Sequence, residues 1–183
     1  MLHYRGPLRS NGSPSHKHDL RIAFHSQLKR LWSQPPLVEY KNLITPPAIV
    51  GDYYLPRPFG PFVFLPLVTA EMNVVAELSL VLLRPESPGH LITQGGDIDN
   101  RLKTLFDALT MPRHANSMPP GVAPSTEQTP YFCCLLEDDN LVTALTVKTE
   151  QMLETVNDPT IVDLSIHVRT RTTRVTIGNP IFA

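Results

Sequence analysis

Two carboxylates and a lysine in the middle of the chain have the spacing of groups that could form a catalytic site. Asp97 and Asp99 follow the glycine pair 95–96, and Lys103 and Asp107 continue the series at intervals of four residues. Residues four apart stack on one face of a helix, so Asp99, Lys103 and Asp107 would lie in a row. A helix cap followed by a solvated polar face has the same spacing. This segment alone leaves both interpretations open.

A second acidic cluster strengthens the catalytic interpretation. Glu137, Asp138 and Asp139 directly follow the apolar run 131–136. Carboxylates at the ends of apolar elements converge easily in a fold, and a divalent cation relieves their mutual repulsion. Oxygen ligands without cysteine favour Mg²⁺ or Mn²⁺. Such an ion activates water, and a nearby lysine neutralises charge on a phosphate, which together suit phosphodiester hydrolysis.

Two other sites that carry an Asp-x-Asp pair do not fit. An EF-hand loop that began at Asp97 would need glycine at its sixth position and glutamate at its twelfth. The chain has Leu102 and Ala108 there. A nucleotide-sugar transferase would bring a nucleotide-binding domain for which 183 residues are too few. The chain also lacks G-x-G-x-x-G, Walker A, H-E-x-x-H and G-x-S-x-G motifs.

Two helices and five strands are expected to position these clusters. Apolar residues spaced i, i+3, i+4 and i+7 predict a helix after Asp99, with its buried face formed by Leu102, Leu105, Phe106 and Leu109. A second helix is predicted over 19–32, capped by Asp19, with its basic residues on a solvated face. Strands are predicted over residues 61–66, 73–83, 131–136, 141–150 and 161–175.

The strands carry further expectations about pairing and burial. We expect the first two to form a hairpin. Core candidates in the last two strands are Val142, Leu145, Val147, Leu164, Ile166 and Val168. Between helix and strand, the loop 110–130 is longer than compact domains usually contain.

The element order predicts an α+β fold, with a mixed or antiparallel sheet and helices packed on one face. We expect residues 1–60 to form an N-terminal extension with one helix and a Pro-rich connection, and residues 61–183 to form the catalytic domain. Within the extension, residues 1–17 are polar and are predicted to be mobile.

Composition limits the partners. Net charge is −1, so a nucleic-acid ligand would need a local basic patch. Candidates for DNA contact are Arg101, Arg113, Arg169, Arg171 and Arg174. Adjacent Cys133 and Cys134 are poor disulfide partners and are expected to be buried thiols. With no signal peptide or membrane helix evident, the sequence predicts a cytoplasmic protein.

The series Asp97-x-Asp99-Asn100-x-x-Lys103-x-x-x-Asp107-Ala108-Leu109, with the downstream pair Asp138-Asp139, resembles the RusA family of Holliday junction resolvases over roughly residues 74–150. The resemblance implies a small α+β homodimer, often prophage-encoded, that cuts four-way DNA junctions with Mg²⁺ in recombination and repair.

The resemblance also implies roles for single residues. Asp97, Asp99 and Asp139 would hold the metal, so we expect their carboxyl groups roughly 4–6 Å apart. Lys103 would be the basic residue needed for activity. Asp138 and Asp107 match motif positions without an assigned role, and Asp107 is also a candidate partner for Lys103.

Two alternatives stay open. Low net charge and the additional segments also fit a catalytically inactive DNA-binding or assembly module that keeps the fold. The carboxylates alone also fit a metal-dependent phosphotransferase or hydrolase acting on nucleotides.

Overall fold

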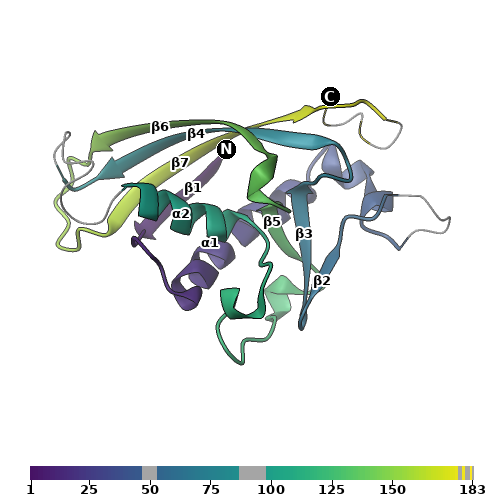
Figure 1. Cartoon of the computed structure of the whole chain (residues 1–183), viewed down its shortest axis with the longest axis horizontal. Coiled ribbons are helices and arrows are strands. Elements are labelled where there is room, and N and C mark those ends of the chain that lie inside the picture. Colours follow the sequence, from purple (N-terminus) through teal and green to yellow (C-terminus); the bar gives the residue numbers. More distant parts are fainter. Residues whose placement is uncertain (47–52, 87–97, 177–178, 180–181, 183) are drawn as a thin grey trace.

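The computed structural model of the chain describes residues 1–46, 53–86, 98–176, 179 and 182 (Figure 1). Its fold is α+β, with mixed sheets. The described helices and strands are β1 (Leu2–Pro7), α1 (Pro14–Trp32), β2 (Arg57–Phe59), β3 (Phe62–Val68), β4 (Val74–Arg84), α2 (Ile98–Leu109), β5 (Phe132–Leu136), β6 (Val142–Gln151) and β7 (Ile161–Thr172). Short 3₁₀ helices η1 to η5 cover Leu37–Glu39, Lys41–Leu43, Ala115–Ser117, Thr126–Gln128 and Asp139–Leu141.

A four-stranded sheet in the order β1-β7-β4-β6 forms the main layer. β7 pairs antiparallel with both β1 and β4, whereas β4 and β6 are parallel. Figure 1 shows α1 and α2 together on one side of this sheet. The residues of β4 alternate between the two faces of the sheet: Leu78, Leu80 and Leu82 are buried, while Ser79 is exposed. One face of the sheet is therefore apolar, and the helices cover that face.

The N-terminal residues belong to this layer, so the prediction that residues 1–17 are mobile is wrong. β1 pairs with β7, with Leu2 opposite Ile166. Helix α1 begins at Pro14, five residues before the predicted cap, because Ser13 accepts a hydrogen bond from the His16 N–H (3.2 Å) and proline suits the first turn. Within residues 1–17, which were predicted to be mobile, the chain forms strand β1 and the first turn of helix α1.

A second sheet, β2-β3-β5, lies beside the first, and it corrects the predicted hairpin. β3 pairs antiparallel with β2 and parallel with β5, not with β4. The physical reason is burial on both faces of β3: Phe62 and Phe64 pack with Phe132 of β5, and the rings of Phe64 and Phe132 stack with centroids 5.0 Å apart.

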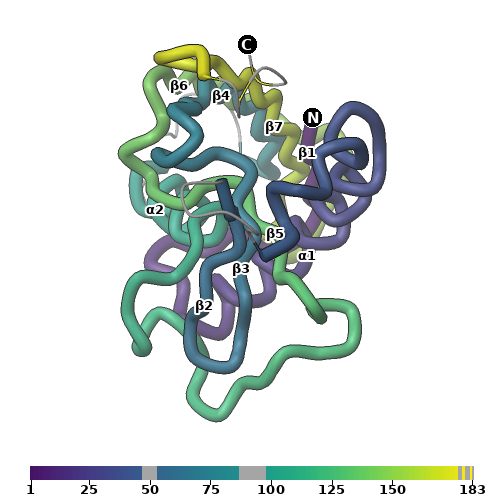
Figure 2. The backbone as a smooth tube through the Cα atoms, turned by 90° about the vertical axis from the view of Figure 1, so that its right-hand side faces the viewer, coloured from purple at the N-terminus to yellow at the C-terminus, as the bar shows by residue number. Residues whose placement is uncertain are grey.

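The long segment 110–131 runs around the outer end of this second sheet (Figure 2). Helix α1 holds it in place. Arg21 is buried and donates to the carbonyl oxygens of Asp107 (2.7 Å) and Ser117 (3.2 Å). His25 Nε2 lies 2.9 Å from the carbonyl oxygen of Glu127. The predicted solvated basic face of α1 is therefore wrong at Arg21, which ties the loop to the core.

Burial confirms most other strand expectations. Leu164 and Ile166 are fully buried, Val168 packs at the edge of the core, and Cys133 and Cys134 are buried. The core assignment of Leu145 is wrong, because its side chain is 44% exposed on the edge strand β6. Within the described residues, neither helix has the length and apolar content needed to cross a bilayer.

Candidate functional site

Helix α2 carries Asp99, Lys103 and Asp107 of the first cluster, and its buried face holds it against the core. Of its predicted buried face, Leu105 and Leu109 are buried, whereas Leu102 and Phe106 are only partly buried; Thr104 and Ala108 complete the inward face. The Thr104 hydroxyl also accepts a hydrogen bond from the Gly12 N–H (2.9 Å), which joins the helix to the turn before α1. These contacts fix the rotation of α2 about its axis and so decide which side chains reach the surface.

Asp99 and Lys103 both occupy exposed positions on the first two turns of α2. They are one helical turn apart, so a carboxylate and an ammonium group face the same solvent region. Asp97 lies outside the described residues. Its predicted role as a metal ligand stays a prediction.

Asp107, one turn further along, has a partner that sequence spacing could not show. Its carboxylate pairs with Lys17 of α1 at 2.7 Å. The pair joins the two helices, since Lys17 lies on the first turn of α1 and Asp107 on the last turn of α2.

Asp138 and Asp139 form a turn beside the far end of α2. The Asp138 carboxylate caps η5 by accepting the Asn140 N–H (2.8 Å). Arg113 forms ion pairs with both carboxylates, at 2.9 Å to Asp139 Oδ1. The sequence therefore placed the two aspartates correctly at a strand end but did not reveal that an arginine of the long loop lies between them.

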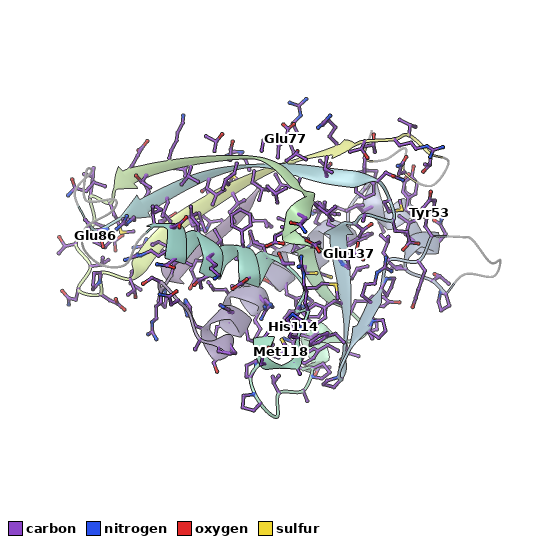
Figure 3. The ribbon with its side chains drawn as sticks, in the orientation of Figure 1. Tyr53, Glu77, Glu86, His114, Met118 and Glu137 are labelled. Carbon is purple, nitrogen blue, oxygen red and sulfur yellow. The ribbon has the colours of Figure 1, made fainter. Side chains whose placement is uncertain are left out.

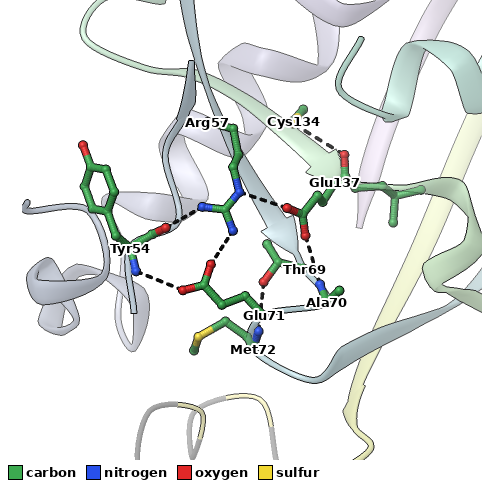
Figure 4. A network of polar contacts seen from close by, with 9 residues as sticks. Tyr54, Arg57, Thr69, Ala70, Glu71, Met72, Cys134 and Glu137 are labelled. Carbon is green, nitrogen blue, oxygen red and sulfur yellow. Dashed lines mark hydrogen bonds and ion pairs between the residues drawn. The ribbon is translucent and has the colours of Figure 1, made fainter. Parts of the chain in front are cut away.

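Glu137 anchors this turn from the other side (Figure 4). Its carboxylate accepts from Arg57 Nε at 2.9 Å and from the Ala70 N–H at 3.0 Å. Arg57 is also paired with Glu71, so one guanidinium links β2, the turn after β3 and the end of β5. Glu137 thus has a structural role. The sequence alone did not distinguish it from the neighbouring Asp138 and Asp139.

A cavity of about 430 Å³ lies between the two helices and the long loop. Asp107 and Asp139 both line it, together with cationic or polar side chains of Lys17, Arg21, Arg113, His114 and Asn116. Figure 3 shows His114 and Met118 in the loop, on the same side of the sheet as Glu137. Burial lowers the pKa of Arg21 to about 10, chiefly through lost hydration, so its guanidinium is still charged at neutral pH.

The two predicted ligands Asp99 and Asp139 lie at opposite ends of α2. Asp99 is in the first turn, near the end of β4, where Arg101 approaches Glu86 at 3.4 Å. Asp139 shares its cavity with Asp107 and Thr110, and Thr110 forms a bridge to Leu136.

A rise of 1.5 Å per residue separates Asp99 from Asp107 by about 12 Å. Figure 3 shows Glu86 beyond one end of the helix and Glu137 beyond the other. Within one chain, Asp99 therefore lies at one end of α2, and Asp139 lies beside the cavity at its other end.

The predicted DNA-contacting arginines have different environments. Arg101 is 1% exposed, and the pKa of its guanidinium is lowered by burial and by Arg84. It lies 3.5 Å from the Pro159 carbonyl oxygen, so it anchors α2 in the core and is not a surface contact. Arg169 and Arg171 are 81% and 57% exposed, each within 4 Å of Glu77 on the outer sheet face.

Arg174 is also exposed, just beyond the end of β7. These three arginines lie on or beyond β7, and the alternation of that strand sets Arg169 and Arg171 on the face opposite the buried Leu164 and Ile166.

Within the part of the chain that the structure describes, no group of three or more His, Cys, Asp or Glu side chains is close enough to hold a metal ion. The predicted group includes Asp97, which is outside that part. Comparison with models of known protein families, with curated protein sequences and with solved structures found no match.

Proposed function

We propose that the chain is a Mg²⁺-dependent, structure-selective endonuclease of the RusA type, which hydrolyses phosphodiester bonds in branched DNA. One observation carries the proposal: α2 is locked by its buried face and presents Asp99 and Lys103 of the motif together at the surface. If α2 had only a solvated polar face, the additional carboxylates would have no explanation: Asp97 precedes the helix, and Asp138 and Asp139 form a second acidic turn.

Asp97, Asp99 and Asp139 are the proposed metal ligands, because carboxylate oxygens are the donors that Mg²⁺ prefers. The ion, when bound, polarises the phosphate and activates water. Lys103 is one turn from Asp99 and exposed, so it is placed to neutralise charge that builds on the phosphate oxygens.

The separation of Asp99 from Asp139 points to a site built by two chains. One chain holds these residues at opposite ends of α2, whereas a twofold dimer would bring Asp99 of one chain to Asp139 of the other. Such a dimer has two equivalent sites, which suits two incisions in a four-way junction.

Cleavage of a labelled four-way junction with Mg²⁺ tests the activity. Asp99→Asn is expected to reduce nicking at least about 100-fold, since metal-ligand contributions amount to several kcal/mol. Asp19→Asn, which removes the same charge from an exposed position of α1, is the matched control and is expected to keep activity. No cleavage of junctions, flaps or forks by the folded parent protein would refute the proposal.

Co-expression of two inactive chains tests the shared site. If each site takes Asp99 from one chain and Asp139 from the other, a mixed dimer of Asp99→Asn and Asp139→Asn keeps one undamaged site, and nicking returns. If each chain built its own site, the mixture would stay as inactive as either variant alone.

One observation favours the second candidate, a DNA-binding module without catalysis. Arg113 already neutralises Asp138 and Asp139, so these carboxylates are paired without a metal ion. That function predicts junction binding that persists in EDTA with no strand cleavage in Mg²⁺ or Mn²⁺. Arg113→Gln separates the two candidates, because it should strengthen metal binding by an endonuclease and only weaken DNA binding by a module.

A further inference from the structure

A cavity of about 580 Å³ opens at the end of helix α1, between the helix and the two sheets. Leu28 and Leu31 of α1 line it, together with Leu67 and Leu135 of the second sheet and Val168 of the main sheet. It is larger than the cavity between the two helices and the long loop. Small-molecule sites typically measure about 300–1,000 Å³, so this cavity has the size of one.

Strands β1 and β7 leave this space open because their ends are not level. Their ladder begins with Leu2 opposite Ile166. β7 continues beyond this pair, and alternation places Val168 and Thr170 on the same inward face as Ile166. In the described ladder no β1 residue lies opposite these two, and both line the cavity. The opening therefore follows from the strand register.

Apolar side chains form most of the cavity wall. Leu28, Leu37 and Leu135 are each at most 7% exposed and so line its deep part, whereas Leu31, at the mouth, is 38% exposed. Water against such a surface is unfavourable, so a ligand gains free energy when its apolar body displaces that water.

The polar side chains of the wall can all donate hydrogen bonds. The amide of Gln27 is occupied, because it donates to the His3 carbonyl oxygen at 2.7 Å and accepts the His3 N–H at 2.9 Å. Arg30, Gln34 and Thr170 also line the cavity, and their side chains have no hydrogen bond or ion pair with the described part of the chain. Among the described residues of the wall, Arg30 is the only one with a charged side chain.

We propose that this cavity binds a small monocarboxylate with an apolar tail, of the class of a medium-chain fatty acid. The tail lies against the leucines between α1 and the second sheet, and the carboxylate stays at the mouth with Arg30. A guanidinium matches the two oxygens of a carboxylate, and Gln34 and Thr170 are further donors on the same wall. The site contains neither Asp99 nor Asp139 and does not depend on the proposed function.

Calorimetric titration of the whole chain, without DNA or metal, tests the tail. Butanoate, hexanoate, octanoate and decanoate are the ligands. Affinity is expected to rise by up to about fourfold for each methylene group added, until the cavity is full. Absence of saturable decanoate binding, or an affinity independent of chain length, would overturn the proposal.

The carboxylate is tested by a change of charge on either side. Decylammonium, which has a similar tail and the opposite charge, is expected to bind at least about tenfold more weakly than decanoate. Arg30→Met keeps the apolar stem of the side chain and is expected to weaken decanoate binding about fivefold, since the ion pair is solvated. Arg9→Met, at another exposed position, is the matched control and should bind like the parent. Equal affinity for both ligands, or an unchanged affinity in Arg30→Met, would refute the assignment of the head group.

Two phenylalanine variants of β7 locate the tail. Thr170→Phe places a ring in the cavity and is expected to weaken decanoate binding at least about tenfold. His167→Phe adds the same ring to the opposite, exposed face of the strand and should leave binding unchanged. Circular dichroism establishes that both variants are folded. Parent-like binding by folded Thr170→Phe would place the ligand elsewhere and overturn the proposal.

Methyl NMR of the leucine-labelled parent chain gives a measurement that needs no substitution. Decanoate is expected to shift the methyl signals of Leu31, Leu67 and Leu135, which line the cavity, and to leave those of Leu145 on the edge strand β6 unchanged. Shifts at Leu145 with none at the three cavity leucines would overturn the proposal.

Discussion

Three buried histidines of α1 predict that the fold loses stability in mild acid. His16, His18 and His25 are 8%, 6% and 3% exposed. Lost hydration lowers the pKa of each below the ordinary value of 6.5, helped at His16 by Arg9 and at His18 by Arg21. The folded protein therefore holds these rings neutral, while the unfolded chain binds protons as the pH falls through 6.5.

Hydrogen bonds fix the neutral form of His25. Its Nδ1 accepts the Cys133 N–H at 2.9 Å, so the proton is on Nε2, which donates to the Glu127 carbonyl oxygen at 2.9 Å. A second proton, on Nδ1, would face the Cys133 N–H and break the link between α1 and β5. His18 has a different problem, because its Nδ1 is buried with no partner in the described structure, between the rings of Phe62 and Phe132.

The sign and size of the effect follow from proton linkage. Stability is complete above pH 6.5 and falls below it, because only the unfolded chain takes up the protons there. Each such histidine contributes a slope of at most about 1.4 kcal/mol per pH unit, so three give at most about 4 kcal/mol per unit. Total stability of a domain is about 5–15 kcal/mol, so a loss of this order is large enough to measure.

Urea unfolding between pH 7.5 and 5.0, followed by circular dichroism, measures the slope. His25→Gln keeps one donor and one acceptor and is expected to reduce the slope by about one third, with His167→Gln at an exposed position as the matched control. A free energy of unfolding that stays constant or rises as the pH falls from 7.5 to 5.0 would refute the reasoning, since a neutral buried histidine must lower it.

Two further predictions concern buried groups. Arg21→Met removes the charged donor to the Asp107 and Ser117 carbonyl oxygens. It should lower the free energy of unfolding in urea by about 1.5–3 kcal/mol and speed proteolysis of the loop 110–131. Arg30→Met, at an exposed position of α1, is the control and should change neither. Burial raises the pKa of the Cys133 thiol to about 12 and that of Cys134 well above its ordinary value, so neither should react with a thiol reagent at pH 8 until the chain unfolds; rapid labelling of the native protein would contradict this.

Periodicity predicted the elements whose burial pattern is local. The face of α2 with Leu105 and Leu109 and the inward residues Leu164 and Ile166 of β7 are buried as expected. Alternation and 3.6-residue spacing follow directly from backbone geometry, so they are visible without knowledge of the neighbours. The general α+β class followed from the order of those elements.

Pairing partners were not visible in the same way. β1 lies more than 150 residues from its partner β7, and β3 joins β5 instead of the nearer β4. A short apolar run contains no information on which strand it will meet, because the choice depends on how all the buried surfaces fit together. This is why residues 2–7 looked mobile and why the first two strand segments looked like a hairpin.

Some features of the candidate site were likewise visible in the sequence, and others depend on packing. By itself, the sequence determined the residue types of the site: two acidic clusters, a lysine one turn from Asp99, and an apolar face that anchors them. Only the tertiary structure decided that Arg101 is buried, that Asp107 pairs with Lys17, and that Arg113 lies against Asp139. It also decided that Asp99 and Asp139 lie at opposite ends of α2. Spacing along the chain specifies which groups share a helix face, but distances between elements arise from packing alone.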